Sequence, residues 1–153
     1  MLDHETMERA MRGYFDACNR GDAEGVASFL TDDAVHYFPP GMYGGPFVGA
    51  LTIGRRWAEA VATLGSIWTV DQIITDPPSR RAAMEWTHFK TYDDKVLRGD
   101  EWYCFEESGL ISEIRAYYAS PQAADLRRLE LGGFAYAERG DPTAPPFVRP
   151  RPA

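Results

Sequence analysis

Residues 19–38 read NRGDAEGVASFLTDDAVHYF, and this stretch decides how the N-terminal half of the chain is organised. Gly21 ends a preceding helix, and Asp22 is a good N-cap for a second one, because a side-chain oxygen can accept from the free N–H groups of a first turn. The polar run 31–33 stops this second helix, and residues 34–38 predict a short strand. The inward residues of the second helix are expected to be Val26, Phe29 and Leu30.

On both sides of this stretch the apolar residues follow a helical period. Before it, they recur every three or four positions and predict an amphipathic helix over about residues 3–19, with Met7, Met11, Tyr14, Phe15 and Cys18 on one face. After it, residues 39–49 (PPGMYGGPFVG) are so rich in proline and glycine that they predict a loop, the best candidate for a lid. A third helix follows over about residues 50–64, with Ile53, Trp57, Val61 and Leu64 on one face.

Beyond residue 64 the hydrophobic period changes to two. Four strands are predicted, over residues 68–76, 81–92, 96–105 and 110–118, separated by the turns DPPSR, DDK and EESG. Helices followed by an antiparallel sheet indicate an α+β domain with helices packed on one sheet face. We assign this domain to residues 1–120. Residues 121–153 are a C-terminal extension, with a short helix expected at 121–131 and a proline-rich tail at 141–153.

Composition limits the possible partners and the cellular setting. The chain has 153 residues, of which 44% are hydrophobic, so it can bury one core. A formal charge of −7 argues against nucleic acids and anionic membranes as partners. The start MLDHETMERAM resembles no signal peptide, and Cys18 and Cys104 form no metal motif. These features predict a cytoplasmic protein. Its aromatic content of 13% predicts an aromatic inner surface.

The order of these elements resembles the NTF2-like superfamily, and most closely its SnoaL-like and ketosteroid-isomerase branch. The phrases that carry the resemblance are NRGDAEGVASFLTDDAV, the helix start at 49–57, and FEESGLISEIRAYY; they span about residues 5–120. The resemblance implies a cone-shaped, curved antiparallel sheet wrapped around three N-terminal helices, with a deep apolar pocket, no cofactor and a homodimer. Because members include isomerases, dehydratases, cyclases and binding domains, the fold alone does not settle the activity.

A period of two also predicts which side chains line that pocket. Its polar members are expected to be Tyr14, His36, His88 and Glu101, the candidate catalytic residues. The candidate substrate-binding residues are Phe38, Trp57, Met84, Trp86, Leu97, Ile114 and Tyr118. They are first of all expected to form core, and only secondly a stacking surface for an aromatic substrate.

The resemblance also suggests roles for the polar residues. Tyr14 and Glu101 match the two donors of the isomerase oxyanion hole, where an apolar pocket keeps a carboxyl group neutral. The isomerase's aspartate base is replaced here by Phe38, whereas His88 matches the histidine of the dehydratases, whose helix-end aspartate is Asn19 here. We therefore expect His88 to be the base, oriented by Glu101 and assisted by His36.

Other roles for the same residues remain open. Tyr14 could be ordinary helix core, Glu101 could pair with Arg98, and the two histidines with Glu101 could form a metal site. The sequence favours a cofactor-independent lyase that acts on a hydrophobic aromatic or polycyclic molecule by β-elimination, dehydration or retro-aldol loss of formaldehyde. The alternatives are a ketosteroid-isomerase-like enzyme, a non-catalytic binding module and a structural dimerisation domain.

Overall fold

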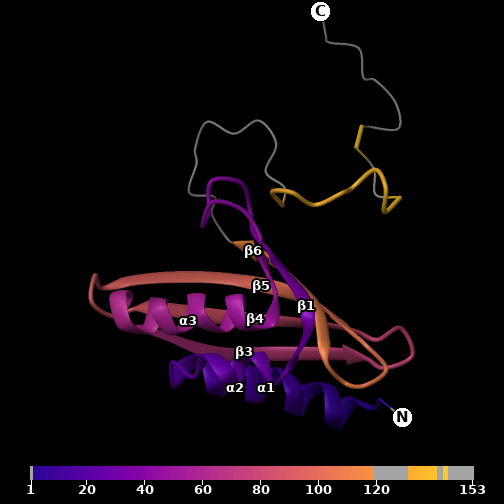
Figure 1. Cartoon of the computed structure of the whole chain (residues 1–153), viewed down its shortest axis with the longest axis horizontal. Helices are drawn as coiled ribbons and strands as arrows, with labels where there is room; N and C mark the ends of the chain where they lie inside the picture. Colours follow the sequence, from indigo (N-terminus) through magenta and orange to yellow (C-terminus); the bar gives the residue numbers. More distant parts are fainter. Residues whose placement is uncertain (1, 119–130, 141–142, 145–153) are drawn as a thin grey trace, which may run out of the picture.

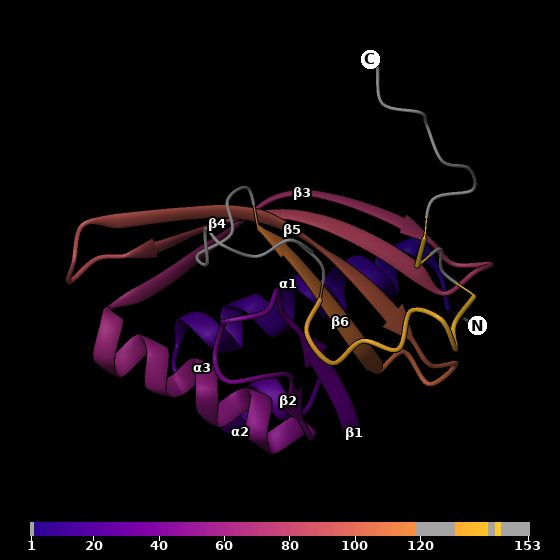
Figure 2. The ribbon, with the colours of Figure 1, turned by 90° about the horizontal axis from the view of Figure 1, so that it is seen from above.

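The computed structural model describes residues 2–118, 131–140 and 143–144. Helices α1 (His4–Asn19), α2 (Ala23–Ala27) and α3 (Ala50–Leu64) lie on one face of a curved sheet (Figures 1 and 2). The strands are β1 (Leu30–Tyr37), β2 (Phe47–Val48), β3 (Ser66–Asp76), β4 (Arg81–Lys90), β5 (Lys95–Phe105) and β6 (Ile111–Tyr118). The predicted α+β architecture is confirmed. The short helix predicted at 121–131 and most of the tail at 141–153 lie outside the described residues.

The six strands have the order β2-β1-β6-β5-β4-β3. All neighbouring pairs are antiparallel except β1 and β6, which run parallel. This pairing brings residues near position 36 beside the last strand of the domain. It therefore places side chains that are far apart in the sequence around one common space.

Both N-terminal helices begin at a capping aspartate, and the cap predicted at Asp22 is confirmed. The Asp3 carboxylate accepts a hydrogen bond of 2.8 Å from the Thr6 N–H at the start of α1, and Asp22 accepts one of 2.9 Å from the Gly25 N–H at the start of α2. Each cap satisfies a backbone donor that has no partner within its helix. All five apolar residues predicted on the inner face of α1 are buried.

The region after α2 differs from the sequence prediction. The prediction ended a helix at residues 31–33, but β1 already begins at Leu30. The partner strand is the reason: Leu30 is paired with Ile111 of β6, and the Ile111 N–H donates to the Phe29 carbonyl at 2.9 Å. The predicted loop 39–49 likewise contains β2, in which Phe47 pairs with His36. Long-range pairing thus overrides the local turn signals.

The predicted alternation of faces holds through the centre of the sheet. Met84, Trp86 and His88 are buried under the helices, whereas Trp102 is 46% exposed on the outer face. Gly99 leaves room for the Trp86 side chain, because a Cβ at position 99 would lie only 2.9 Å from the indole ring. In β6 the strict alternation fails: a register shift between Cys104 and Phe105 leaves both Ile111 and Ile114 buried, which a period of two does not predict.

Two other features complete the outer surface of this sheet. The Arg98 guanidinium donates to Thr87 Oγ1 at 2.8 Å on the outer face, so Arg98 is not the partner of Glu101. The segment 131–140 lies against β1 and β6: the Gly132 N–H donates to the Phe38 carbonyl at 2.8 Å, and Arg139 forms an ion pair of 2.6 Å with Glu113.

Among the described helices, none is long and apolar enough to span a membrane.

Candidate active site

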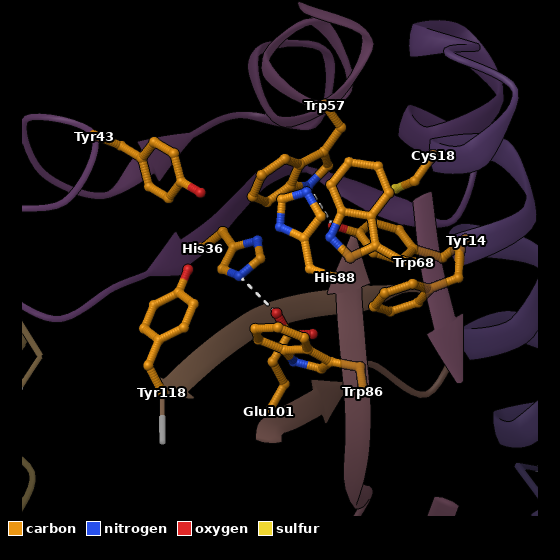
Figure 3. A pocket seen from close by; sticks show the side chains of 11 residues that line it. Tyr14, Cys18, His36, Tyr43, Trp57, Trp68, Trp86, His88, Glu101 and Tyr118 are labelled. Carbon is orange, nitrogen blue, oxygen red and sulfur yellow. Dashed lines mark hydrogen bonds and ion pairs between the residues drawn. The ribbon is translucent and has the colours of Figure 1, made fainter. Parts of the chain in front are cut away.

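A small cavity lies between the helices and the inner face of the sheet (Figure 3). All four predicted catalytic residues line it. Its volume is about 20 Å³, which is room for about one water molecule. The full lining consists of Tyr14, Phe15, Cys18, His36, Tyr43, Trp57, Trp68, Trp86, His88, Glu101 and Tyr118. The cavity wall is thus mostly aromatic, with a few ionisable groups.

His36 and Glu101 form a buried pair at the centre of this cavity. His36 Nε2 lies 3.2 Å from Glu101 Oε1, and the two side chains are 1% and 6% exposed (Figure 3). The contact is not an aligned hydrogen bond, and His36 Nδ1 has no partner among the described residues. The second oxygen of Glu101 accepts a short hydrogen bond from the Tyr103 hydroxyl. Tyr103 therefore holds one oxygen of Glu101, while the other oxygen faces His36 across β6.

The ring of His36 is fixed by its neighbours as well. Phe38 stacks on it, with ring centroids 4.2 Å apart, and Trp57 presents an edge at 5.4 Å. Phe38 therefore packs against the His36 ring and does not itself line the cavity. A ring held in this way can keep one nitrogen toward Glu101 while the other remains available.

His88 has a different environment. Its Nε2 is hydrogen-bonded to Ser66 Oγ at 2.7 Å, and its ring stacks on Trp68 with centroids 4.4 Å apart. Burial, and to a lesser extent the charge of Lys90, lowers the pKa of His88 from 6.5 to about 4. Glu101 pairs across the sheet with Met84, whereas His88 pairs with Leu97. The expectation that Glu101 orients His88 was therefore wrong, because their register differs by four residues.

The hydroxyl of Tyr14 is engaged as an acceptor. It accepts a hydrogen bond of 2.8 Å from Trp57 Nε1. Burial raises the pKa of both Tyr14 and Cys18 well above the usual values, so both stay protonated. A protonated thiol is a poor nucleophile. Cys18 also lines the cavity.

The predicted substrate-binding residues divide into two groups. Trp57, Trp86 and Tyr118 line the cavity. The other four do not: Met84 and Ile114 are buried in the core, Phe38 lies behind His36, and Leu97 is half-buried near the end of β5. An inward position on a strand was a correct prediction for these residues, but a curved sheet offers more inward positions than one small cavity can use.

Sequence reasoning missed four lining residues: Phe15, Cys18, Tyr43 and Trp68. Phe15 and Cys18 had been assigned to the buried face of α1, and Trp68 lies on a predicted strand, so their inward direction was readable. Tyr43 gave no such signal, because it belongs to the irregular loop 39–49. Its φ of 53° is unusual for a residue other than glycine, and it is held there by ring contacts with Phe38 and Phe47.

Asn19, the residue that replaces the helix-end aspartate of the dehydratases, has a clear structural partner. Its amide donates to the Trp68 carbonyl and accepts from the Trp68 N–H, each at 2.8 Å. This double contact fixes the end of α1 to β3. Because Trp68 stacks on His88, Asn19 also helps to position that histidine.

A second pocket of about 200 Å³ opens to solvent beside the first. Tyr43 and Trp57 line both, so these two rings form the wall between them. Small-molecule sites usually measure about 300–1,000 Å³, and the inner cavity is far smaller. A substrate would therefore reach His36 from this side only if Tyr43 moves. In the part of the chain that the structure describes, no three His, Cys, Asp or Glu side chains are grouped so that they could hold a metal ion.

Comparison with protein families shows where this chain belongs. Residues 11–114 match the model of the SnoaL-like domain. The chain is a member of the SnoaL-like family. This confirms the resemblance drawn from the sequence, and the family contains enzymes as well as proteins of unknown function. No curated protein matches the sequence.

Solved structures of SnoaL-like and related proteins extend the comparison. A protein of unknown function with a cystatin-like fold from Methylobium petroleophilum PM1 is 51% identical; the match covers 97% of this chain and 99% of that one, with a TM-score of 0.94. SalBIII, an epoxide hydrolase/cyclase-like enzyme in pyran ring formation, is 14% identical over 86% of this chain and 98% of its own, with a TM-score of 0.65. A candidate ketosteroid isomerase from Kribbella flavida DSM 17836 is 22% identical over 81% and 84%, with a TM-score of 0.62. The latter two share the fold.

Proposed function

We propose that this protein is a cofactor-independent acid–base enzyme, of the lyase class, that acts on a hydrophobic aromatic small molecule. One observation carries the proposal: His36 Nε2 lies 3.2 Å from the buried Glu101 carboxylate, inside an aromatic cavity, while Nδ1 has no partner among the described residues. A carboxylate that faces one imidazole nitrogen favours the proton on that nitrogen and leaves the other free to accept one.

In this proposal His36 replaces His88 as the base. When Nδ1 takes a proton from the substrate, the positive charge that develops on the ring is stabilised by Glu101, which Tyr103 holds in place. The contact between His36 and Glu101 is not yet aligned, and catalytic hydrogen bonds often tighten only when substrate binds. His88, with a pKa of about 4, remains neutral near pH 7 and is a weaker base.

The chemistry that fits this base is proton removal followed by loss of a neighbouring group. In a dehydration, His36 takes a proton from carbon, the C–O bond breaks, and the protonated His36 gives that proton to the leaving hydroxide, which departs as water. In a retro-aldol reaction, His36 takes the hydroxyl proton, the C–C bond breaks with release of formaldehyde, and the protonated His36 gives that proton to the carbanion. An isomerase reaction has less support, because Phe38 occupies the position of the isomerases' aspartate and packs against His36.

The proposal is tested by mass spectrometry in deuterated buffer with a panel of aryl alcohols, aryl diols, enones and ketosteroids. Wild-type protein is compared with His36→Gln, and with Glu85→Gln as a matched surface control. Loss of water or formaldehyde that depends on His36 supports a lyase, and deuterium uptake without fragmentation indicates an isomerase instead. Retention of ligands from the panel with no turnover would replace the proposal by a binding module.

A further inference from the structure

The structure leaves the substrate oxygen only one of the two donors that the sequence predicted for it. Both oxygens of Glu101 already have partners, in His36 and Tyr103. The Tyr14 hydroxyl accepts from Trp57 Nε1, so its own O–H is the one predicted donor that remains. A proton-removal reaction builds negative charge on an oxygen of the substrate, and that charge needs preorganised hydrogen-bond donors. The cavity wall offers further donors.

Tyr43 and Tyr118 offer such donors on the opposite side of the cavity from Tyr14. Tyr43 comes from the loop between β1 and β2, and Tyr118 ends β6; both line the cavity. Figure 3 shows their hydroxyl groups pointing toward one another beside His36. Each phenol carries one O–H, so an oxygen seated between the two hydroxyls would accept from both.

Each hydroxyl is held in place by its surroundings. The Tyr43 ring contacts Phe38, Phe47 and Trp57, with centroids 4.8, 5.3 and 5.9 Å away. The Tyr118 ring packs against the edge of Trp86, with centroids 5.5 Å apart. Donors fixed by packing need little reorganisation when charge develops, which is the condition for effective stabilisation.

We propose that Tyr43 and Tyr118 form the oxyanion-stabilising pair of this site, and that the substrate carries a carbonyl or phenolic oxygen which binds between them while His36 removes a proton. The claim that the pair stabilises charge during catalysis rests on the proposed function. The claim that the pair binds an oxygen of a ligand does not. Burial raises the pKa of both phenols, so both remain protonated donors near neutral pH. Because Tyr43 belongs to the loop that separates the cavity from the outer pocket, it must move to admit the substrate, and the donor pair forms when its hydroxyl faces Tyr118 again.

The binding part is tested with 4-nitrophenol, whose anion is distinguished from the neutral form by its absorption spectrum. The pKa of the bound phenol is measured in wild-type protein and in Tyr43→Phe, Tyr118→Phe, Tyr14→Phe and the exposed control Tyr92→Phe. Loss of either proposed donor should destabilise the bound phenolate. The acid dissociation constant of bound 4-nitrophenol should therefore fall about 10-fold to 100-fold, which means that its pKa rises. Tyr92→Phe should leave it unchanged, and melting temperatures check that each variant folds.

Three results would overturn the binding part. They are an unchanged ionisation constant in both Tyr43→Phe and Tyr118→Phe, an effect confined to Tyr14→Phe, and failure of folded wild-type protein to bind 4-nitrophenol. The first result removes the pair. The second returns the role to the residue predicted from the sequence. The third shows that the site does not accept a phenolate oxygen.

The catalytic part is tested with the substrate found in the panel. Each of Tyr43→Phe and Tyr118→Phe should lower kcat about 100-fold with little change in KM, because the donors act mainly on the charged transition state. Full activity in both variants, with activity still lost in His36→Gln, overturns the donor pair and leaves the proposed function standing. No turnover in wild type, with the expected response to 4-nitrophenol, overturns the function and leaves the binding site.

Discussion

The two histidines of the cavity are almost equally buried, yet they have opposite chemical environments. His36 is 1% exposed and faces a carboxylate, whereas His88 is 2% exposed and faces a serine hydroxyl. The carboxylate can stabilise a protonated ring, but the hydroxyl cannot neutralise a charge, so burial dominates at His88 and lowers its pKa to about 4. Residue type and burial alone therefore do not distinguish the two histidines; the group that each ring faces does.

The strongest test of this comparison removes the charge of Glu101. In Glu101→Gln the side chain keeps its size but no longer stabilises the His36 imidazolium, so kcat should fall about 100-fold to 10,000-fold. Glu85→Gln, a change at an exposed position on the outer face of the same sheet, is the control. Steady-state kinetics on the panel substrate measure both. Full activity in Glu101→Gln, with loss of activity in His88→Gln, would return the role of base to His88.

A second test uses the pH dependence of stability. The folded-state pKa of His88 is about 4 and the unfolded value is 6.5. Between these values the unfolded chain binds the extra proton, so the stability contributed by His88 is full above pH 6.5 and is lost as the pH falls toward 4. The free energy of unfolding should fall by about 3 kcal/mol over this range.

Urea denaturation at several pH values, with His88→Gln as the reference, isolates this contribution from that of the carboxylates. The difference between the two proteins should shrink as the pH falls from 7 to 4. A difference in the free energy of unfolding that stays constant over this range would mean that His88 has the same pKa in the folded and the unfolded chain. The contrast between the environments of His36 and His88 would then be lost.

A third test addresses how His88 is positioned. Asn19→Ala removes two hydrogen bonds to the Trp68 backbone, and this should lower the free energy of unfolding by about 1–2 kcal/mol. Asn19→Asp keeps the acceptor for the Trp68 N–H and should lose less. Chemical denaturation measures both variants. Equal stability of wild type and Asn19→Ala would show that α1 and β3 are held together without this contact.

The smallest expected effect concerns the partner of His88. Ser66→Ala removes the hydroxyl that bonds to His88 Nε2 and should lower the free energy of unfolding by about 1 kcal/mol. Near pH 4, where the folded ring is partly protonated, its Nε2–H still donates to the hydroxyl, so the cost should persist at both pH 7 and pH 4. Thermal and urea unfolding at the two pH values measure it, and stability equal to that of wild type at both would contradict the assigned partner.

Much of the fold was readable in advance, because its signals are local. The cap at Asp22, the apolar face of α1 and the alternation along β4 depend on neighbours a few residues away, and the sequence carries them directly. The errors came where distant strands decide. The start of β1 at Leu30 and the inward turn of Ile111 follow from the pairing of β1, β5 and β6, which no local pattern records.

For the candidate site, the sequence by itself determined which polar side chains face inward: Tyr14, His36, His88 and Glu101 all line one cavity. Only the tertiary structure decided which of them meet. The parallel pairing of β1 with β6 brings His36 to Glu101, and the register of β4 against β5 keeps His88 away from it. The physical reason is that the direction of a side chain follows from the strand period, whereas contact between two charges depends on the register of strands far apart in the chain.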